Sequence, residues 1–251
     1  MLARVVFLLF IFCFNKLYNH SLYIKNVDDI ICALLNAVYF NGDWKEAFET
    51  SATKSEPFTT ATGEKLDVPM MHRTFKNRDV VDLRTATLFS LPYRGEEIDM
   101  VFALPNKEML LDVSELYEGL KNVHRRGSCM VRVTIPKFKI TYKNDSLTET
   151  LKLLGINSIF DERSDLSGMT GGVNKRLYIS QIIHKAVIDV NERGTEAAAA
   201  TGMMMMRMAM PRMPPQEKLF LLDRPFYFFI VSRKTGTILF CGHIENPMAA
   251  N

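Results

Sequence analysis

The sequence has few cysteines and no pair of them in a metal-binding motif. Cys13, Cys32, Cys129 and Cys241 are far apart, and none belongs to a CxxC or CxxH pair. Zinc-finger and thioredoxin-like chemistry therefore have no support. A disulfide framework is not expected in a chain of 251 residues, which is long enough to form a sizeable core. We expect the four residues to be free, buried thiols.

Catalytic and nucleotide-binding motifs are also missing. No GxSxG surrounds a serine, and neither GxGxxG nor GxxxxGK[ST] occurs, so the sequence offers neither a hydrolase nucleophile elbow nor a common phosphate cradle. The histidines are mutually distant and have no ligand partner at metal spacing. We expect no enzyme activity and no cofactor, and we expect His184, within an apolar strand, to be a hydrogen-bonded core residue.

The chain lacks a strong charge of either sign. Its 31 Lys and Arg residues nearly balance 28 Asp and Glu residues, for a formal net charge of +3. Basic residues cluster only briefly, at His124, Arg125 and Arg126. Because a surface that follows phosphates needs many clustered cations, we expect no nucleic-acid partner.

The sequence also lacks a hydrophobic run long enough to span a membrane as a helix. Arg4 precedes an apolar run from Val5 to Phe14, which matches the hydrophobic part of a signal peptide and is shorter than the ~20 residues of a transmembrane helix. No small-x-small cleavage site follows it. We interpret residues 1–27 as a signal-peptide-like or unmatched segment and predict secretion, with no membrane attachment once it is cleaved. An uncleaved anchor and an incorrectly assigned start codon remain alternatives.

The remainder of the chain has the alternation and turn signals of a β-rich α+β protein. Helices are predicted at Asp112–Val123, capped by Ser114, and at Ser146–Leu154, where Ser146 and Glu149 resemble a capping box and Gly155 ends the helix. A phase slip at Pro136 predicts a bulge or an edge strand. Strands are predicted at Ile31–Phe40, closed by a turn at Asn41-Gly42, and at Ile98–Leu104, Ile179–Val190, Leu219–Val231 and Thr237–Ile244.

One stretch, GTEAAAATGMMMMRMAM from Gly194 to Met210, has an unusual composition. Its alanines alone would favour a helix, but the flanking GTE and TG fit neither a good cap nor a helix continuation. Thioether sulfur is a ligand for Cu(I), so a copper site is one interpretation of the methionines. No cysteine or histidine stands beside them to support it.

Several segments together resemble the serpins, the serine protease inhibitor superfamily. They span about Asp28 to Pro247 and imply a serpin-like, multi-sheet α+β fold with few helices over residues 28–251. The matching segments, in order, are NAVYFNGDW (Asn36–Trp44), VPMM (Val68–Met71), LPYRGEEIDMVFAL (Leu91–Leu104), IPKF (Ile135–Phe138), HKAVIDVNE (His184–Glu192), GTEAAAAT (Gly194–Thr201), RPF (Arg224–Phe226) and GHIENP (Gly242–Pro247).

The resemblance implies a reactive-centre loop at about residues 192–218, which a serine protease cleaves and which then inserts into the main sheet. It places Asn36, Trp44 and His184 in main-sheet motifs. The implied hinge residues are Glu192, Gly194, Thr195, Glu196, Ala197, Ala198, Ala199, Ala200 and Thr201. Counting from the hinge puts the cleaved bond at Met208-Ala209. Arg207-Met208 and Arg212-Met213 are the alternatives.

The composition of the hinge suits a loop that becomes a strand. Thr195, Ala197 and Ala199 fall, with Thr201, on one face of a period-two strand and would turn into the core, whereas Glu196 would face solvent. Met208 before the bond would suit an elastase-like or chymotrypsin-like protease with an apolar pocket. An arginine there would suit a trypsin-like enzyme, whose pocket holds a carboxylate.

The sequence departs from the family at its N-terminal end. Counterparts of several helices and of some main-sheet strands are missing, so we expect exposed apolar faces and a monomer that is prone to aggregate. Two functions remain open: a suicide-substrate inhibitor, and a non-inhibitory fragment or isoform that is cleaved as a plain substrate. Asn144, in the sequon Asn144-Asp145-Ser146, is a possible glycosylation site in a secreted chain.

Overall fold

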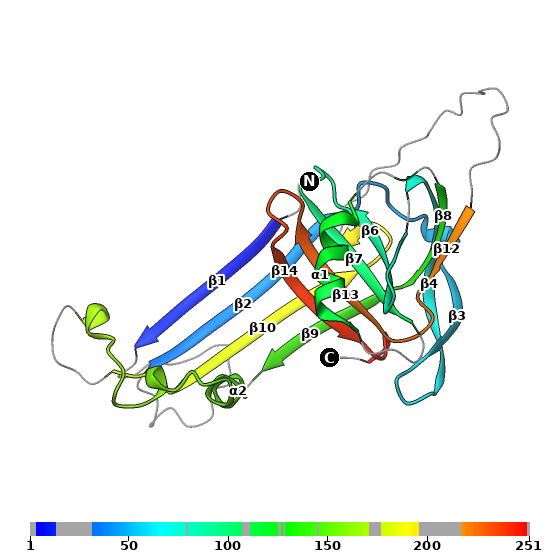
Figure 1. Cartoon of the computed structure of the whole chain (residues 1–251). Coiled ribbons are helices and arrows are strands. Elements are labelled where there is room, and N and C mark those ends of the chain that lie inside the picture. Colours follow the sequence, from blue (N-terminus) through cyan, green and yellow to red (C-terminus); the bar gives the residue numbers. More distant parts are fainter. Residues whose placement is uncertain are drawn as a thin grey trace. The chain divides into compact units, whose positions relative to one another are not determined.

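The computed structural model describes residues 4–13, 32–78, 80–106, 111–124, 127, 129–144, 146–170, 177–195 and 217–249. These residues form three sheets and two α-helices (Figure 1). They divide into two compact units. One is formed mainly by Asn41–Lys139 and Asp189–Ala250, and the other mainly by Val5–Phe40 and Ile140–Ile188.

The first sheet has the strand order β1-β2-β10-β9, with β11 paired to the end of β2. The central pair is parallel, from Gln181 opposite Ala33 to Val187 opposite Tyr39. Burial alternates along β2 from Val38 to Asp43, and β10 includes the exposed Lys185, so these strands are not buried on both faces. The bounds are β1 (Arg4–Cys13), β2 (Cys32–Asp43), β9 (Phe138–Asn144), β10 (Gln181–Val190) and β11 (Gly194–Thr195).

The second sheet has the order β12-β8-β4-β3. Its longest pairing joins β4 and β8 in antiparallel register, and β12 adds to β8 in parallel. One face of β8 is buried at Val131, Val133 and Ile135, the alternation that the sequence predicts. The bounds are β3 (Lys54–Thr59), β4 (Lys65–Arg78), β8 (Cys129–Pro136) and β12 (Glu217–Leu221).

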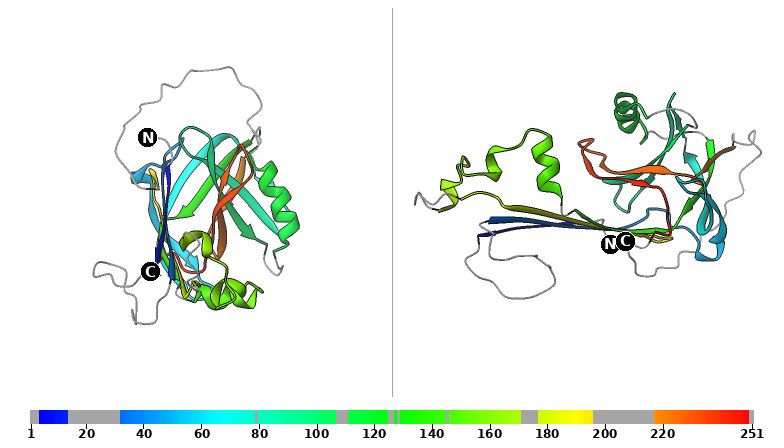
Figure 2. Two further views of the ribbon diagram at one scale, coloured as in Figure 1. Left: turned by 90° about the vertical axis from the view of Figure 1, so that its left-hand side faces the viewer. Right: turned by 90° about the horizontal axis from the view of Figure 1, so that it is seen from below.

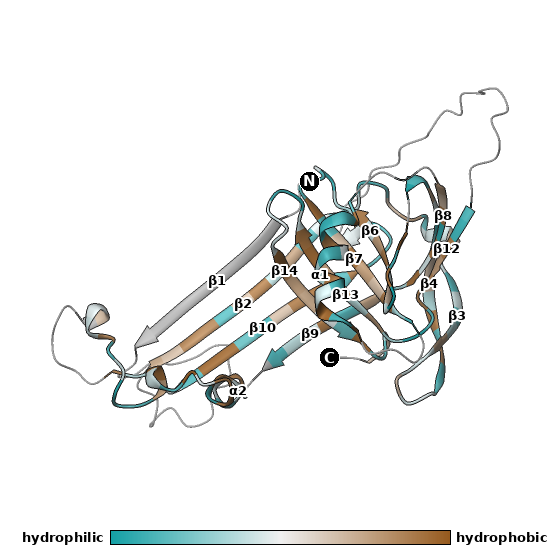
Figure 3. Cartoon of the chain, in the orientation of Figure 1, coloured by the Kyte–Doolittle hydropathy of each residue, from teal (hydrophilic) through white to brown (hydrophobic). Residues whose placement is uncertain are grey.

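The third sheet is antiparallel, with the order β14-β13-β7-β6-β5. Its central strands β7 and β13 are almost entirely apolar and buried (Figure 3), because they are covered on both faces. Aromatic rings join this sheet to the second one, as where Phe89 packs 5.8 Å from Phe75 and 5.3 Å from Phe220 between ring centroids. The bounds are β5 (Val81–Asp82), β6 (Ala86–Pro92), β7 (Ile98–Pro105), β13 (Phe226–Ser232) and β14 (Ile238–Ile244).

Helix α1 (Val113–Asn122) covers the face of the third sheet opposite to the one that contacts the second sheet (Figure 2). Leu116 and Leu120 pack there against Leu88, Val101 and neighbouring side chains. The helix does form where its period predicts, but its cap differs. The carboxylate of Asp112, rather than Ser114, accepts hydrogen bonds from the backbone N–H groups at the helix start, since Asp112 is the residue with extended backbone just before the first turn.

Helix α2 (Leu147–Leu153) belongs to the second unit. It begins after Ser146 and ends before Gly155, which has a φ of +91°, as the sequence predicts. The capping box is wrong, because the Ser146 side chain makes no capping hydrogen bond. Instead, the buried Thr148 hydroxyl accepts a hydrogen bond from the backbone N–H of Ile182 in β10 at 3.1 Å, and this contact holds the helix against the strand.

Several expected strand boundaries are corrected. Strand β2 continues through Asn41-Gly42 to Asp43 without a turn, because that end pairs with β11. Pro136 marks neither a bulge nor an edge. It ends β8, which lies between β4 and β12, and β9 starts in another sheet at Phe138. The predicted strand Leu219–Val231 is two strands, β12 and β13, which are separated around Pro225 and belong to different sheets.

The cysteines follow the prediction only in part. Cys32 and Cys129 are buried thiols, but the Cys241 thiol is exposed on β14, the edge strand of the third sheet. Within the described ranges, no helix is long and apolar enough to cross a membrane. No grouping of three or more potential metal ligands occurs among these same residues.

Candidate functional site

The described part of the predicted hinge forms a tight turn after β10, at Asn191–Gly194. The backbone N–H of Asn191 donates to the carbonyl of Gly194 at 2.9 Å, and the N–H of Gly194 donates back at 3.2 Å. The Asn191 side chain accepts from the N–H of Arg193 at 3.1 Å. The turn reverses the chain, so that Gly194 and Thr195 run antiparallel to β2 as strand β11.

Gly194 is required by the closeness of this approach. Its φ is +143°, and a Cβ atom there would lie 2.0 Å from the carbonyl oxygen of Gly42 and 2.7 Å from the Cα of Asp43. No real side chain tolerates such distances to backbone atoms. The glycine that the sequence places at the hinge therefore allows β11 to contact the end of β2.

Glu192 is buried beneath this turn, with only 6% of its surface exposed. Its carboxylate accepts a hydrogen bond from the Thr53 hydroxyl at 2.8 Å and pairs with Lys137 Nζ at 3.0 Å. Burial raises the pKa of the carboxyl, but hydrogen bonds from its own backbone N–H, Thr53 and Lys137 outweigh burial and hold the pKa below its usual value. The residue therefore anchors the start of the hinge as a carboxylate.

Trp44, the single tryptophan of the chain, lies beside the hinge. It belongs to a stretch, residues 42–48, that we call the Trp44 segment. The indole Nε1 of Trp44 donates to the carbonyl of Asn191 at 2.9 Å, and the backbone N–H of Trp44 donates to the carbonyl of Arg193 at 2.8 Å. Further along, the N–H of Phe48 donates to the carbonyl of Glu192 at 2.7 Å. Every residue from Asn191 to Thr195 thus contacts this segment or pairs with it.

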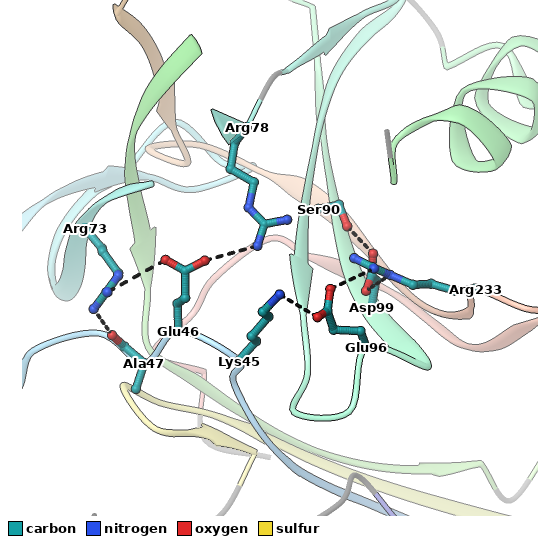
Figure 4. Close-up of polar contacts among 9 residues, drawn as sticks. All are labelled: Lys45, Glu46, Ala47, Arg73, Arg78, Ser90, Glu96, Asp99 and Arg233. Atoms are coloured by element: carbon teal, nitrogen blue, oxygen red, sulfur yellow. Dashed lines mark hydrogen bonds and ion pairs between the residues drawn. The ribbon is translucent and has the colours of Figure 1, made fainter. Parts of the chain in front are cut away.

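Side-chain pairs hold the other residues of the Trp44 segment (Figure 4). Lys45 Nζ lies 2.5 Å from Glu96 Oε1, and Glu46 pairs with Arg78 at 3.3 Å. Arg73 donates to the carbonyl of Ala47. These pairs come from β4 and from the turn between β6 and β7, so distant parts of the chain position the segment that contacts the turn at Asn191–Gly194.

The other predicted main-sheet residues lie away from the hinge turn in the sequence and in their contacts. Asn36 and His184 are opposite each other across β2 and β10. The His184 ring is only partly buried and lies 6.2 Å from the Tyr142 ring between centroids. The expectation of a core histidine is therefore wrong, because this residue is only half-buried.

The remaining predicted site residues lie outside the described residues. They are Glu196, Ala197, Ala198, Ala199, Ala200, Thr201, Arg207, Met208, Ala209, Arg212 and Met213. Asn144 ends β9, and its side chain is not described. Sequence reasoning missed Lys137 and Thr53. Lys137 stands in the quoted IPKF motif, but no local signal connects it to a glutamate 55 positions away.

A serine, a histidine and an aspartate also meet in the third sheet, without forming a catalytic triad. Ser90 Oγ lies 2.6 Å and His124 Nδ1 lies 2.7 Å from the same oxygen of Asp99, Oδ2. In a catalytic triad the histidine accepts a hydrogen bond from the serine hydroxyl. Here both the serine and the histidine are hydrogen-bonded to the aspartate instead. Arg233 Nε donates to the other oxygen at 2.6 Å. Burial raises the Asp99 pKa, but the hydrogen bonds from His124, Arg233 and Ser90 lower it further than burial raises it.

Comparison with known proteins agrees with this geometry. The sequence model described as "Serpin (serine protease inhibitor)" matches residues 22–247. The chain belongs to the serpin family.

Among curated serpins, the chain is 38% identical to the leukocyte elastase inhibitor of Bos taurus over 231 residues, which is 85% of this chain and 58% of that protein. It is 35% identical to a serine protease inhibitor of Cyanea capillata, with 86% and 57% covered. Neuroserpin of Gallus gallus is 34% identical, with 87% and 54% covered. The chain thus spans little more than half of the length of these relatives.

Solved structures show the same fold. Serpin48 of Tenebrio molitor matches with a TM-score of 0.68 and 31% identity, covering 87% of this chain and 57% of that one. The thermophilic serpin tengpin in its native state matches with a TM-score of 0.70 and 26% identity, covering 89% and 58%. The multi-sheet serpin fold with few helices is therefore established for the matched part.

Proposed function

We propose that the chain acts as a serpin-type suicide-substrate inhibitor of serine proteases. The observation that carries the proposal is the pairing of Gly194 and Thr195 with the end of β2. These residues lead directly into the predicted reactive-centre loop. They already run antiparallel to β2, the direction that an inserting strand needs beside it.

The register of β11 extends this argument. Gly194 lies opposite Asp43 and Thr195 opposite Gly42, so the same register continued along β2 would bring Ala197 opposite Phe40 and Ala199 opposite Val38. Phe40 and Val38 are buried. Residues directly opposite each other share a face, so the small residues of the hinge would turn to the buried side of β2, as their spacing predicts.

Insertion would have to separate strands that are now paired. Strands β2 and β10 are opposite each other from Ala33 to Tyr39, and an added strand must replace those hydrogen bonds with new ones on both of its edges. Each main-chain bond contributes roughly 0.5–1.5 kcal/mol net. An extra strand has two bonded edges, so the inserted state gains bonds overall and is favoured once cleavage frees the loop.

The protease would enter through the ordinary first step of its own reaction. Its serine attacks the carbonyl carbon of Met208, the amine of Ala209 leaves with a proton, and the protease stays esterified to Met208. Insertion would then distort the enzyme before water completes hydrolysis. Met208 favours proteases with an apolar pocket, and Arg207 or Arg212 would favour trypsin-like ones. The naming of several relatives as protease inhibitors supports the general class of partner.

We further propose that the chain is secreted and that Asn144 is glycosylated. The support is the apolar run from Val5 to Phe14 behind Arg4 and the sequon at Asn144. Expression in secretory cells, followed by N-terminal sequencing and glycosidase treatment of the medium, tests both. A chain retained in the cells without a glycan would contradict them.

A second candidate function is that of a plain substrate. The direct pairing of β2 with β10 over seven residue pairs favours it, because every one of those contacts slows insertion. If deacylation is faster than insertion, the protease cleaves the loop and escapes.

Incubation with trypsin and with elastase separates the two functions. A covalent complex that survives SDS is the result expected for the inhibitor, with the C-terminal piece beginning at Ala209 for elastase and at Met208 or Met213 for trypsin. Thr195→Arg is the matched variant, because it puts a charge on the inward face and should be cleaved without forming a complex. Complete cleavage of the unaltered chain without a complex would leave only the substrate function.

A further inference from the structure

The Trp44 segment also contacts the turn between β6 and β7, residues 93–97. The N–H of Arg94 donates to the carbonyl of Asp43 at 2.7 Å, and the N–H of Lys45 donates to the carbonyl of Pro92, just before the turn, at 2.9 Å. The ring of Trp44 stacks on that of Tyr93 with centroids 4.5 Å apart. The residues that touch the hinge therefore also touch this turn.

Glu96, in this turn, has an unusual backbone. Its φ is +56°, after Gly95 at +96°. A non-glycine residue at positive φ is uncommon, and it persists where the surroundings hold it there. The carboxylate of Glu96 lies between two cations: Oε1 is 2.5 Å from Lys45 Nζ, and Oε2 is 3.5 Å from Arg233 Nη1 (Figure 4).

Arg233 is itself held in place from the interior. Its Nε donates to Asp99, a carboxylate with no exposed surface. Asp99 is shared with Ser90 of β6 and with His124, which follows α1. The backbone N–H of Arg233 also donates to the carbonyl of Glu97 at 2.9 Å. The guanidinium is therefore positioned before it meets Glu96.

A series of contacts thus connects the buried carboxylate of Asp99 to the Trp44 segment. It passes from Asp99 to Arg233, then to Glu96, and from Glu96 to Lys45, which is part of that segment. An isolated surface ion pair contributes little, because two free side chains must be ordered to form it. Here Arg233 is already ordered by Asp99, and Glu96 by the turn, so less entropy is lost when Lys45 completes the array.

We propose that Glu96 is a positioning residue of the hinge. It holds the Trp44 segment through Lys45 and so sets how firmly Asn191–Gly194 is retained before the loop inserts. Its effect on protease trapping rests on the proposed function, whereas its hold on the segment does not.

The direct test is amide hydrogen exchange, which reports local opening, in Glu96→Gln and in the matched control Glu97→Gln. Glu97 is the exposed next residue, and the control makes the same charge change. In Glu96→Gln the amides of Trp44 and Phe48 should exchange roughly two- to fivefold faster, the range of a single ion pair of this exposure. In Glu97→Gln they should exchange at the unaltered rate. Equal rates in the two variants would overturn the proposal.

A second variant guards against a change in the turn itself. Lys45→Met removes the other partner while keeping the length of the side chain, and it should accelerate the same two amides. The double variant should be no faster than Glu96→Gln alone, because that variant already lacks the ion pair with Lys45. Additive accelerations would show independent effects and would contradict the array.

The functional readout is the ratio of SDS-stable complex to cleaved chain after reaction with protease. Glu96→Gln should shift this ratio by a similar factor, and Glu97→Gln should not. If neither the unaltered chain nor any variant forms a complex, the inhibitor function is wrong. Faster exchange in Glu96→Gln but not in Glu97→Gln would still support the positioning role.

Discussion

Gly194 is the residue on which the geometry of the hinge depends most. Its lack of a side chain lets β11 lie against the carbonyl of Gly42, and its φ of +143° is open to glycine alone. A larger residue would have to push the two backbones apart. The sequence shows the glycine, but only the structure shows the atoms that exclude a methyl group.

Gly194→Ala should therefore destabilise the folded chain by about 2–4 kcal/mol, from backbone strain together with lost β11–β2 pairing. Urea unfolding followed by Trp44 fluorescence measures this directly, since the indole donates to Asn191.

Gly63→Ala is the matched control for backbone strain. Gly63 also has a positive φ, of +83°, but nothing lies within 4 Å of its added Cβ. It should cost about 1 kcal/mol, the strain alone. Equal costs for the two variants would mean that the contact with Gly42 does not matter.

Asp99 should make the free energy of unfolding depend on pH in the acidic range. Its pKa is lowered in the folded state because hydrogen bonds from His124, Arg233 and Ser90 outweigh burial. A lowered pKa contributes stability above the unfolded value of about 3.9, and this contribution is lost as pH falls through the folded pKa. The pKa of Glu192 is also lowered, so its contribution is likewise lost as pH falls below its unfolded value of about 4.3.

Urea midpoints between pH 7 and pH 3 should therefore fall less steeply in Asp99→Asn than in the unaltered chain. At pH 7 the variant should be less stable by about 2–4 kcal/mol, because Arg233 loses its buried partner. Asp67→Asn, at an exposed position, should follow the unaltered profile. An Asp99→Asn curve parallel to that profile would contradict this assignment.

Among the elements, helix α1 shows how far a sequence pattern reaches. Its apolar spacing predicts both its place and its buried face, because that period is intrinsic to the helix. The sequence predicts the wrong cap, because Asp112 and Ser114 are both good capping residues and only the backbone decides which one precedes the first turn.

Asp112→Ala should cost about 1 kcal/mol of stability, the usual contribution of an N-cap. The loss also removes its contact with Arg84, an exposed pair that adds little. Ser114→Ala should change stability by less than about 0.5 kcal/mol. Thermal unfolding of both variants ranks them, and a larger loss in Ser114→Ala would restore the cap predicted from the sequence.

The sequence predicts where strands occur better than where they begin and end. The apolar runs of β2, β7 and β10 predict strands, but Asn41-Gly42 reads as a turn only until β11 is known to pair there. Likewise, Pro136 and Pro225 mark passages from one sheet to another. Membership of a sheet depends on partners that are far away in the sequence, and local patterns do not contain it. The contacts of Glu192 with Thr53 and Lys137 were missed for the same reason.

For the whole molecule, the account requires two folded states of one chain. In the first, β2 and β10 are paired and, within the part of the chain that the structure describes, Gly194 and Thr195 pair with the end of β2. In the second, the cleaved loop adds a strand. The family and the fold follow from the sequence and the comparisons, whereas the energy difference between the two states does not, because it depends on how well the sheet accepts the strand.

The thermal stability of the chain before and after cleavage of its loop tests this account most directly. Trypsin at a low ratio to the chain should cut at Arg207 or Arg212, and N-terminal sequencing confirms the bond. If the loop inserts, the cleaved chain should unfold at a temperature higher by well over 10 °C, because an added strand contributes several kcal/mol in hydrogen bonds and buried area. An unfolding temperature that stays the same or falls after cleavage would contradict it.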